Sequence, residues 1–306
     1  MAASVEISSL DNINYKSKIK IIFYILIVFF LFVFAFMSYY PIGDKLKVFL
    51  KSNLKGTGCN PDFDEIRMEW IMPKLVISDL KLPASCLGRT GDTLEFSHVT
   101  LNYQLINFAP FGLPFRLDTE LYGQPITVYF VQGLGQRMIR MKDQTIALSR
   151  LQPLLGGNFK LAGNVTVDLN LTVGSNNLMK GLSLIAESKD LQIPSQSIQG
   201  FTAPNLKINT LRVEANSEAP PRINVDKLIL GDADSPLRAN FKGRIDLQEG
   251  AVAFSPINLA GEVAFSETFK QQLPLIDMMF QSFTQKDGFY QIRLGGTLGA
   301  PKPSAP

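Results

Sequence analysis

Residues 159–173 read FKLAGNVTVDLNLTV, and this stretch decides the fold class. Its odd positions are apolar except for Gly163, and its even positions are polar except for Ala162. Successive side chains of a β-strand point to opposite faces, so the pattern predicts a sheet with one apolar face and one wet face. Because fifteen residues exceed a usual strand, either one long curved strand or two strands in the same phase would fit.

The same alternation recurs towards the C-terminus, most clearly over residues 237–248, 257–265 and 290–298. Weaker runs cover 94–103, 114–130, 182–193, 206–215 and 223–230. We take the apolar positions of the two clearest runs as the candidate apolar sheet face: Leu161, Val165, Val167, Leu169, Leu171, Phe241, Ile245 and Leu247. The pattern changes phase between Ile208 and Leu211, which predicts a bulge or a tight turn.

These runs predict a mainly β protein with an extended, curved antiparallel sheet and one or two short helices. Alternation with one polar face is typical of antiparallel sheets, and no βαβ rhythm appears. The apolar face could be buried in a gutter, a sandwich or a closed barrel. One helix is expected from Phe269 to Phe283, begun by Ser266 and Glu267, with Pro274 kinking it or marking its start. The last residues, PKPSAP (301–306), are expected to form an unpacked tail, with 304–306 disordered.

An uncharged run of twenty residues, Ile21–Tyr40, predicts a transmembrane helix. At 1.5 Å per residue it would span about 30 Å, the thickness of the hydrocarbon core of a bilayer. A cleaved signal peptide is the alternative, but its apolar region would be shorter and would end in a small-x-small site. We expect residues 1–20 in the cytoplasm and 41–303 on the far side of the membrane, because long domains translocate largely regardless of charge.

A short amphipathic helix is predicted directly after this run, over residues 44–54. Its apolar residues fall at helical spacing, with lysines elsewhere on the surface: Leu46, Phe49, Leu50 and Leu54. The helix could cap the end of the sheet, or it could lie on the membrane with its lysines near anionic headgroups. Both readings remain open at this point.

Composition and motifs indicate no enzyme and no cofactor. The 306 residues are 46% hydrophobic and 19% charged, with a net charge of +3, which argues against a nucleic-acid-binding protein. No P-loop, G-x-G-x-x-G, H-E-x-x-H or G-x-S-x-G motif occurs, so no catalytic, cofactor-binding or metal-ligating residues are predicted. The single histidine, His98, is expected to be an ordinary sheet residue, and Asp62, Asp64 and Glu65 a solvated turn.

The two cysteines, Cys59 and Cys86, both follow the predicted membrane span. If that side of the membrane is oxidising, they can form a disulfide. The closed loop of roughly 27 residues would stabilise the fold by about 3 kcal/mol in the chain-entropy model. The alternative is two independent buried thiols.

Three segments resemble the type II secretion system protein N family, in its longer form, and through it the AsmA-like envelope proteins. PKLVISDLKL (73–82) is similar to the family's strand of the form Pro-Gly-Leu…Asp-Leu, with Lys74 in place of the glycine. INTLRVEANSEAPPRINVDKLILGDADSPLRANFKGRIDL (208–247) resembles a run of strands ending in Gly-x-Ile-x-Leu. YQIRLGGTLGAPKP (290–303) is similar to the closing strand, and the resemblance covers roughly residues 16–303.

The resemblance implies a single-pass protein of the bacterial inner membrane with a periplasmic β-rich domain. It implies a non-enzymatic accessory or structural role in type II protein secretion, with other secretion subunits as partners. We expect strand-edge pairing as the binding mode in that case. The alternative function is an AsmA-like groove that binds or transports lipid, lined by the candidate apolar sheet face. Against it stands the reading that these residues pack into an ordinary core.

Overall fold

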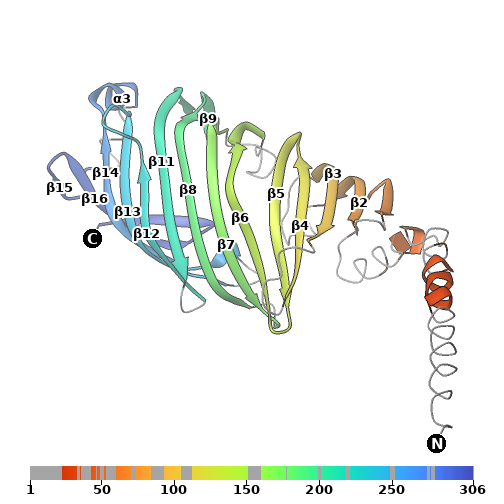
Figure 1. The fold of residues 1–306 in the computed structure, drawn as a ribbon. Helices are drawn as coiled ribbons and strands as arrows, with labels where there is room; N and C mark the ends of the chain where they lie inside the picture. Colours follow the sequence, from red (N-terminus) through yellow and green to blue (C-terminus); the bar gives the residue numbers. More distant parts are fainter. Residues whose placement is uncertain are drawn as a thin grey trace, which may run out of the picture.

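The computed structural model is dominated by one large antiparallel sheet of 15 strands (Figure 1). It describes residues 23–32, 35, 43–45, 47–48, 52, 60–69, 74–83, 93–104, 112–150, 160–176, 178–198, 201–217, 221–248, 252–273, 276 and 280–305. The strands from β1 to β8 are β1 (Glu65–Glu69), β2 (Lys74–Leu82), β3 (Leu94–Tyr103), β4 (Gly112–Leu121), β5 (Gln124–Gly133), β6 (Gln136–Ala147), β7 (Asn164–Gly174) and β8 (Met179–Ile193). They are followed by β11 (Leu206–Ser217), β12 (Arg222–Leu230), β13 (Leu237–Asp246), β14 (Ile257–Phe265), β15 (Gln285–Lys286), β16 (Phe289–Thr297) and β17 (Ala300–Ser304).

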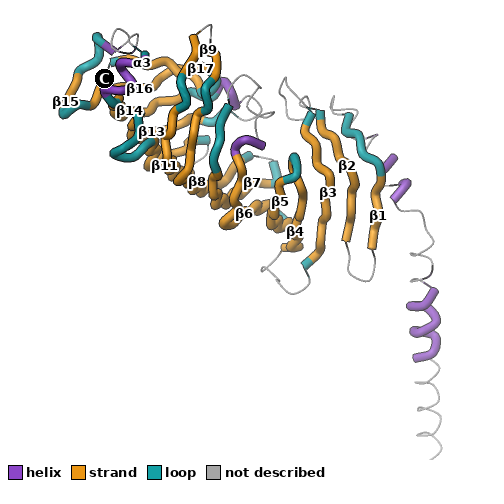
Figure 2. Tube along the Cα trace, turned by 90° about the horizontal axis from the view of Figure 1, so that it is seen from above, coloured by secondary structure: helices purple, strands orange, loops and turns teal. Residues whose placement is uncertain are grey.

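The strands follow one another as a meander, each paired antiparallel with its neighbour in the chain. Two places depart from this order. A separate hairpin, β9 (Gln196–Ile198) with β10 (Phe201–Ala203), is inserted between β8 and β11, and β14 pairs with β16, beyond which lie β15 and β17. The sheet is not closed, and the extensive contacts between described elements all join neighbouring strands. The sheet is therefore a curved single layer, which agrees with the predicted gutter and not with a sandwich or a barrel (Figure 2).

Irregular residues within the strands explain the bends of the sheet. Asp79, Asp143 and Asn209 have positive φ angles of 50°, 48° and 60°, and the pairing register shifts at Asp143 and Asn209. Such bulges bend a strand and increase its twist. The bulge at Asn209 confirms the irregularity predicted from the phase change between Ile208 and Leu211.

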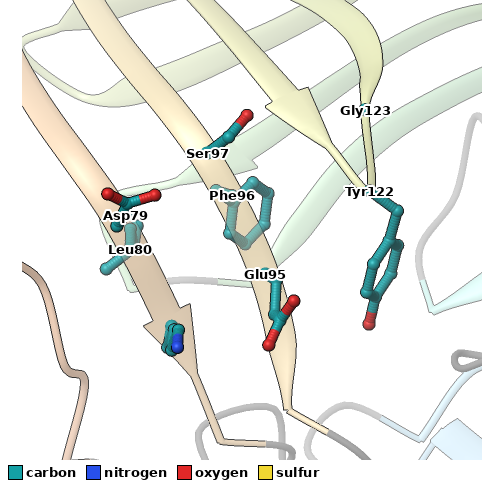
Figure 3. A pocket seen from close by; sticks show the side chains of 8 residues that line it. Asp79, Leu80, Glu95, Phe96, Ser97, Tyr122 and Gly123 are labelled. Atoms are coloured by element: carbon teal, nitrogen blue, oxygen red, sulfur yellow. The ribbon is translucent and has the colours of Figure 1, made fainter.

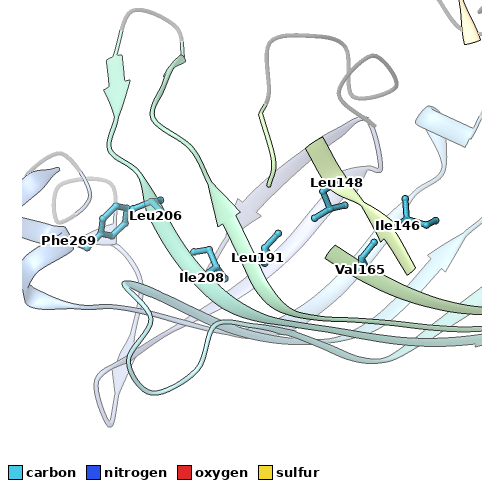
Figure 4. Close-up of a cluster of buried hydrophobic side chains, with 7 residues drawn as sticks. All are labelled: Ile146, Leu148, Val165, Leu191, Leu206, Ile208 and Phe269. Carbon is cyan, nitrogen blue, oxygen red and sulfur yellow. The ribbon is translucent and has the colours of Figure 1, made fainter. Parts of the chain in front are cut away.

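The buried core lies towards the C-terminal half of the sheet, in two clusters. The first consists of Ile146, Leu148, Val165, Leu191, Leu206, Ile208 and Phe269, which Figure 4 shows on the concave side of the bent strands. The second consists of Val225, Ala239, Phe241, Leu259, Val263 and Ile292. Ile208 is fully buried in the first cluster.

The helix α3 (Glu267–Gln272) covers this end of the concave face and is shorter than predicted. Ser266 caps it as expected, its Oγ accepting a hydrogen bond from the Phe269 amide at 3.2 Å. The helix ends at Gln272, and Ile276 is helical again. Pro274 lies outside the described residues, so its role as a kink or as the start of a helix stays a prediction. Phe280 is helical again, but Phe283 already lies in a bend, so one helix from Phe269 to Phe283 was also wrong.

The predicted C-terminal tail is likewise corrected. Residues Ala300–Ser304 form β17, paired with β16 over Arg293–Thr297, and their side chains are exposed. Pro301 and Pro303 lack the N–H group that a further strand would need, which fits their place at the edge of the sheet. At the other edge, Gly43 lies against the Ile66 carbonyl of β1, and Lys47 donates a hydrogen bond to the Asp64 carbonyl at 2.9 Å.

Part of the predicted membrane span can be described. Residues 23–32 are helical, and their apolar side chains are exposed. Among the residues that the structure describes, no helix has the length and apolar character needed to cross a bilayer. The transmembrane helix and the placement of its flanking residues therefore stay predictions. Cys59 and Cys86 lie outside the described residues, so the disulfide is also a prediction.

Candidate functional site

The concave surface of the sheet, which we call the inner face, is built from one set of alternating residues. Cross-strand pairing carries this set from strand to strand: Leu75 lies opposite Leu101, and Leu101 opposite Leu117. Further along, Leu117 lies opposite Val128. Because directly paired residues share a face, one apolar surface runs across the strands without interruption.

The middle of the sheet continues the inner face in the same way. Phe115 pairs with Phe130, Phe130 with Ile139, and Ile139 with Leu171. The rings of Tyr103 and Phe115 are 5.6 Å apart, and those of Phe115 and Phe130 are 6.3 Å apart. These separations are typical of contacting aromatic pairs, so an aromatic row crosses the groove at β3, β4 and β5.

Burial divides the inner face into two parts. At the C-terminal end, Phe269 of α3, Ile276 and Phe280 fill the groove. Phe280 lies 5.0 Å from Phe265 and 5.3 Å from Tyr290, measured between ring centres. From β2 to β8, most inner-face side chains are only half-buried, including Leu117, Val128 and Leu169. This half-buried stretch is the candidate functional site, and we call it the open groove.

The structure brings the predicted apolar face together on this one surface. Val165 and Phe241 are buried, one in each core cluster, and Leu161, Val167 and Ile245 pack around them partly exposed. Leu169 and Leu171 lie in the open groove between β6 and β8. Leu247 follows β13 and is also half-buried. The residues of this one pattern therefore lie partly in the two core clusters and partly in the open groove.

Residues of the open groove on β3, β4 and β5 were missed, although β4 carries a clear signal. Phe115, Leu117 and Leu121 alternate with charged residues in FRLDTEL (115–121). In the neighbouring β5 the alternation is not visible in the sequence, because Val131 and Tyr129 place apolar side chains on the outer face as well. A pairing argument between the two runs, rather than each run alone, would have found the groove residues.

The outer, convex face carries the polar chemistry, and this chemistry is that of a solvated sheet. Arg212 contacts Glu214 at 2.5 Å and Glu187 at 3.2 Å, with Lys227 at 3.3 Å from Glu214. The hydrogen bond from Arg212 lowers the pKa of the Glu214 carboxyl. His98 lies within β3, as expected, and its Nε2 is 2.6 Å from the Thr100 hydroxyl. Among the described residues, no group of acidic, cysteine or histidine side chains could hold a metal ion.

Two hollows lie at the ends of strands. One, of about 270 Å³, opens where β2 bulges at Asp79, and Figure 3 shows that Glu95, Phe96 and Tyr122 line it. The other, of about 370 Å³, lies between β11 and α3 and is lined by residues including Asn209 and Phe269. Both have mixed polar and apolar walls, so neither resembles the apolar surface of the open groove.

Comparison of the chain with protein-family models, with curated proteins and with solved structures gave no match.

Proposed function

We propose that the open groove binds the acyl chains of membrane lipids. The observation that supports this most directly is the apolar inner face, most of which is left half-buried from β2 to β8 outside the first core cluster. Burying a Leu, Val or Phe side chain fully is worth about 1.5–3 kcal/mol, so each half-buried residue leaves at most about 1 kcal/mol unrealised. A row of such residues favours an apolar occupant, and continuous exposed apolar surfaces of this kind usually mark binding sites.

The dimensions of the groove suit this occupant. Neighbouring strands are about 4.8 Å apart, so the six spacings from β2 to β8 give a groove of roughly 29 Å. An extended acyl chain occupies about half of the ~30 Å hydrocarbon core of a bilayer. One chain laid across the strands would therefore fit within the open groove, and its carbon atoms would contact the inner face along its length.

The accessory role in type II secretion, which the resemblance implies, stays a prediction, as do the inner-membrane location and the lack of enzyme activity. Strand-edge pairing is not favoured by the geometry. The edge strand β17 contains Pro301 and Pro303, and residues Gly43 and Lys47 lie against β1 at the other edge. The face of the sheet, rather than its edges, is the surface left for a ligand.

Photocrosslinking at two adjacent residues tests the proposal. Leu169 faces the groove and Asn170 the outer surface of β7, so the photoreactive amino acid benzoylphenylalanine at either position samples the same strand from opposite sides. Full-length protein carrying it is irradiated in native membranes, purified, and analysed by mass spectrometry. We expect lipid adducts from position 169 and few from position 170.

The result has two informative alternatives. Equal lipid adducts at both positions would indicate general contact with membrane rather than a groove, and would contradict the proposal. Protein adducts at position 169 without lipid would contradict it too, and would point instead to a partner protein seated in the groove. Position 128 in β5, compared with position 129, provides an independent pair on the same two faces.

A further inference from the structure

The exposed apolar side chains of the sheet gather at one end of the strands. We call this end the apolar rim and define it by the six large apolar residues there that are exposed: Leu113, Leu134, Leu178, Val252, Phe254 and Leu298. Leu134 is 97% exposed at the tip of the β5–β6 turn, and Phe254 is 67% exposed before β14. Only two other large apolar residues of the described sheet are exposed, Tyr129 and Ile185, and both lie on the outer face.

The strand directions place all six at the same end. In an antiparallel meander, alternate connections lie at opposite ends of the sheet. The β5–β6, β7–β8, β13–β14 and β16–β17 connections share one end, and Leu113 lies at the start of β4, which begins there too. The β4–β5 and β12–β13 turns lie at the other end.

Charge differs between the two ends as well. The described residues of the connections at the apolar rim are uncharged, whereas those at the opposite end include Arg150, Asp232, Asp234 and Asp287. Two cations stand directly behind the tips of the rim. Arg137 follows Leu134 by three residues, and the exposed Lys180 follows Leu178 by two.

We propose that the apolar rim docks onto the surface of an anionic lipid bilayer, with the tips at Leu113, Leu134 and Leu178 entering it. Apolar tips with cations behind them match the interface of such a bilayer, where side chains enter the headgroup region and cations meet anionic headgroups. The apolar helical residues 23–32 lie on the same side: Figure 2 shows them beyond the end of β1 that continues towards β2. This docking does not depend on whether the open groove holds lipid.

Docking would set the orientation of the groove. The rim is formed by the ends of the strands whose inner faces line the open groove, so a docked rim holds one long side of the groove at the headgroup level. In that orientation the ends of the strands contact the membrane, and the sheet is not held at a distance from the membrane by a single helix. That geometry differs from a domain that is merely tethered, and it can be measured.

Fluorescence quenching by brominated lipids tests the proposal on the full chain. The only tryptophan, Trp70, is replaced in W70F, and a reporter is added as Leu134→Trp or Leu178→Trp. The matched control is Ala233→Trp, an exposed residue of the β12–β13 turn at the opposite end. Each variant is reconstituted into vesicles of phosphatidylethanolamine and phosphatidylglycerol, with or without bromine on the acyl chains.

We expect about a twofold loss of emission at positions 134 and 178 and almost none at 233, because only rim side chains reach the acyl region. Equal quenching at all three positions, or none at 134 and 178, would overturn the proposal. The loss of emission should be smaller when phosphatidylcholine replaces phosphatidylglycerol, and smaller in the K180Q variant. If neither change affected the loss, the preference for anionic lipids would be overturned. Quenching that survives transfer into bromine-free detergent would indicate lipid carried by the protein, and would contradict docking.

Discussion

Replacing Ile208 by alanine should destabilise the sheet more than any comparable change on its outer face. Ile208 is 0% exposed and sits in the first core cluster beside the bulge at Asn209. Ile→Ala removes three carbon groups, worth about 2.4 kcal/mol at 0.8 kcal/mol each. The cavity left behind adds to this, so the full cost is expected within about 2–5 kcal/mol. Ile208→Val removes one group and should cost about 0.5–1.5 kcal/mol.

The matched control is Ile185→Ala in β8, on the outer face. Ile185 is 41% exposed, so the same truncation loses at most about 1.4 kcal/mol, and water fills the space it leaves. The free energy of unfolding is measured by urea titration of the full chain in detergent, followed by circular dichroism, with unchanged m-values as the condition for comparison. If Ile208→Ala cost no more than Ile185→Ala, the inner face would not be the stabilising core, and the assignment of the two faces would be wrong.

Three further predictions follow from particular contacts. Ser235→Ala should lower the free energy of unfolding by about 1–3 kcal/mol, because the buried Ser235 hydroxyl donates to the Ile208 carbonyl at 2.5 Å and accepts from the Asp232 amide at 2.9 Å. The control, Ser183→Ala at an exposed position, should change it by no more than about 0.5 kcal/mol in the same titration. Asp190 accepts a hydrogen bond from the Asn164 amide at 2.8 Å, which lowers the pKa of its carboxyl, so the stabilisation is present above about pH 4 and is lost as the pH falls through the lowered pKa. In Asp190→Asn, the free energy of unfolding should therefore fall less steeply as the pH is lowered below about 4, and an unchanged acid dependence would count against this. Gly261→Val should destabilise the β13–β14 pair, because a side chain there meets the Asn240 carbonyl and the ring of Phe241. Amide hydrogen exchange in the two strands should become faster in this variant and stay near its original rate in the control Glu262→Val, which lies on the other face.

The pattern in the sequence specified the sheet because burial on a strand repeats every second residue. Strands β7, β13, β14 and β16 all fall where the alternation is clearest, and the bulge at Asn209 falls where the phase changes. Local chemistry was equally direct at Ser266, whose side chain caps α3. Prolines misled the prediction at the C-terminus, where Pro301 and Pro303 argued for a tail instead of an edge strand.

Alternation by itself determined that this protein has a large antiparallel sheet with one apolar face, including residues Val165, Leu169 and Phe241. It could not determine whether that face would be covered, because a half-buried strand and a core strand have the same period. Only the tertiary structure decided this: α3 and Phe280 fill the groove at its C-terminal end, while Leu117 and Leu169 stay half-buried. The apolar rim was equally invisible in the sequence, because Leu113, Leu134 and Leu178 meet at one end only through the strand order of the folded sheet.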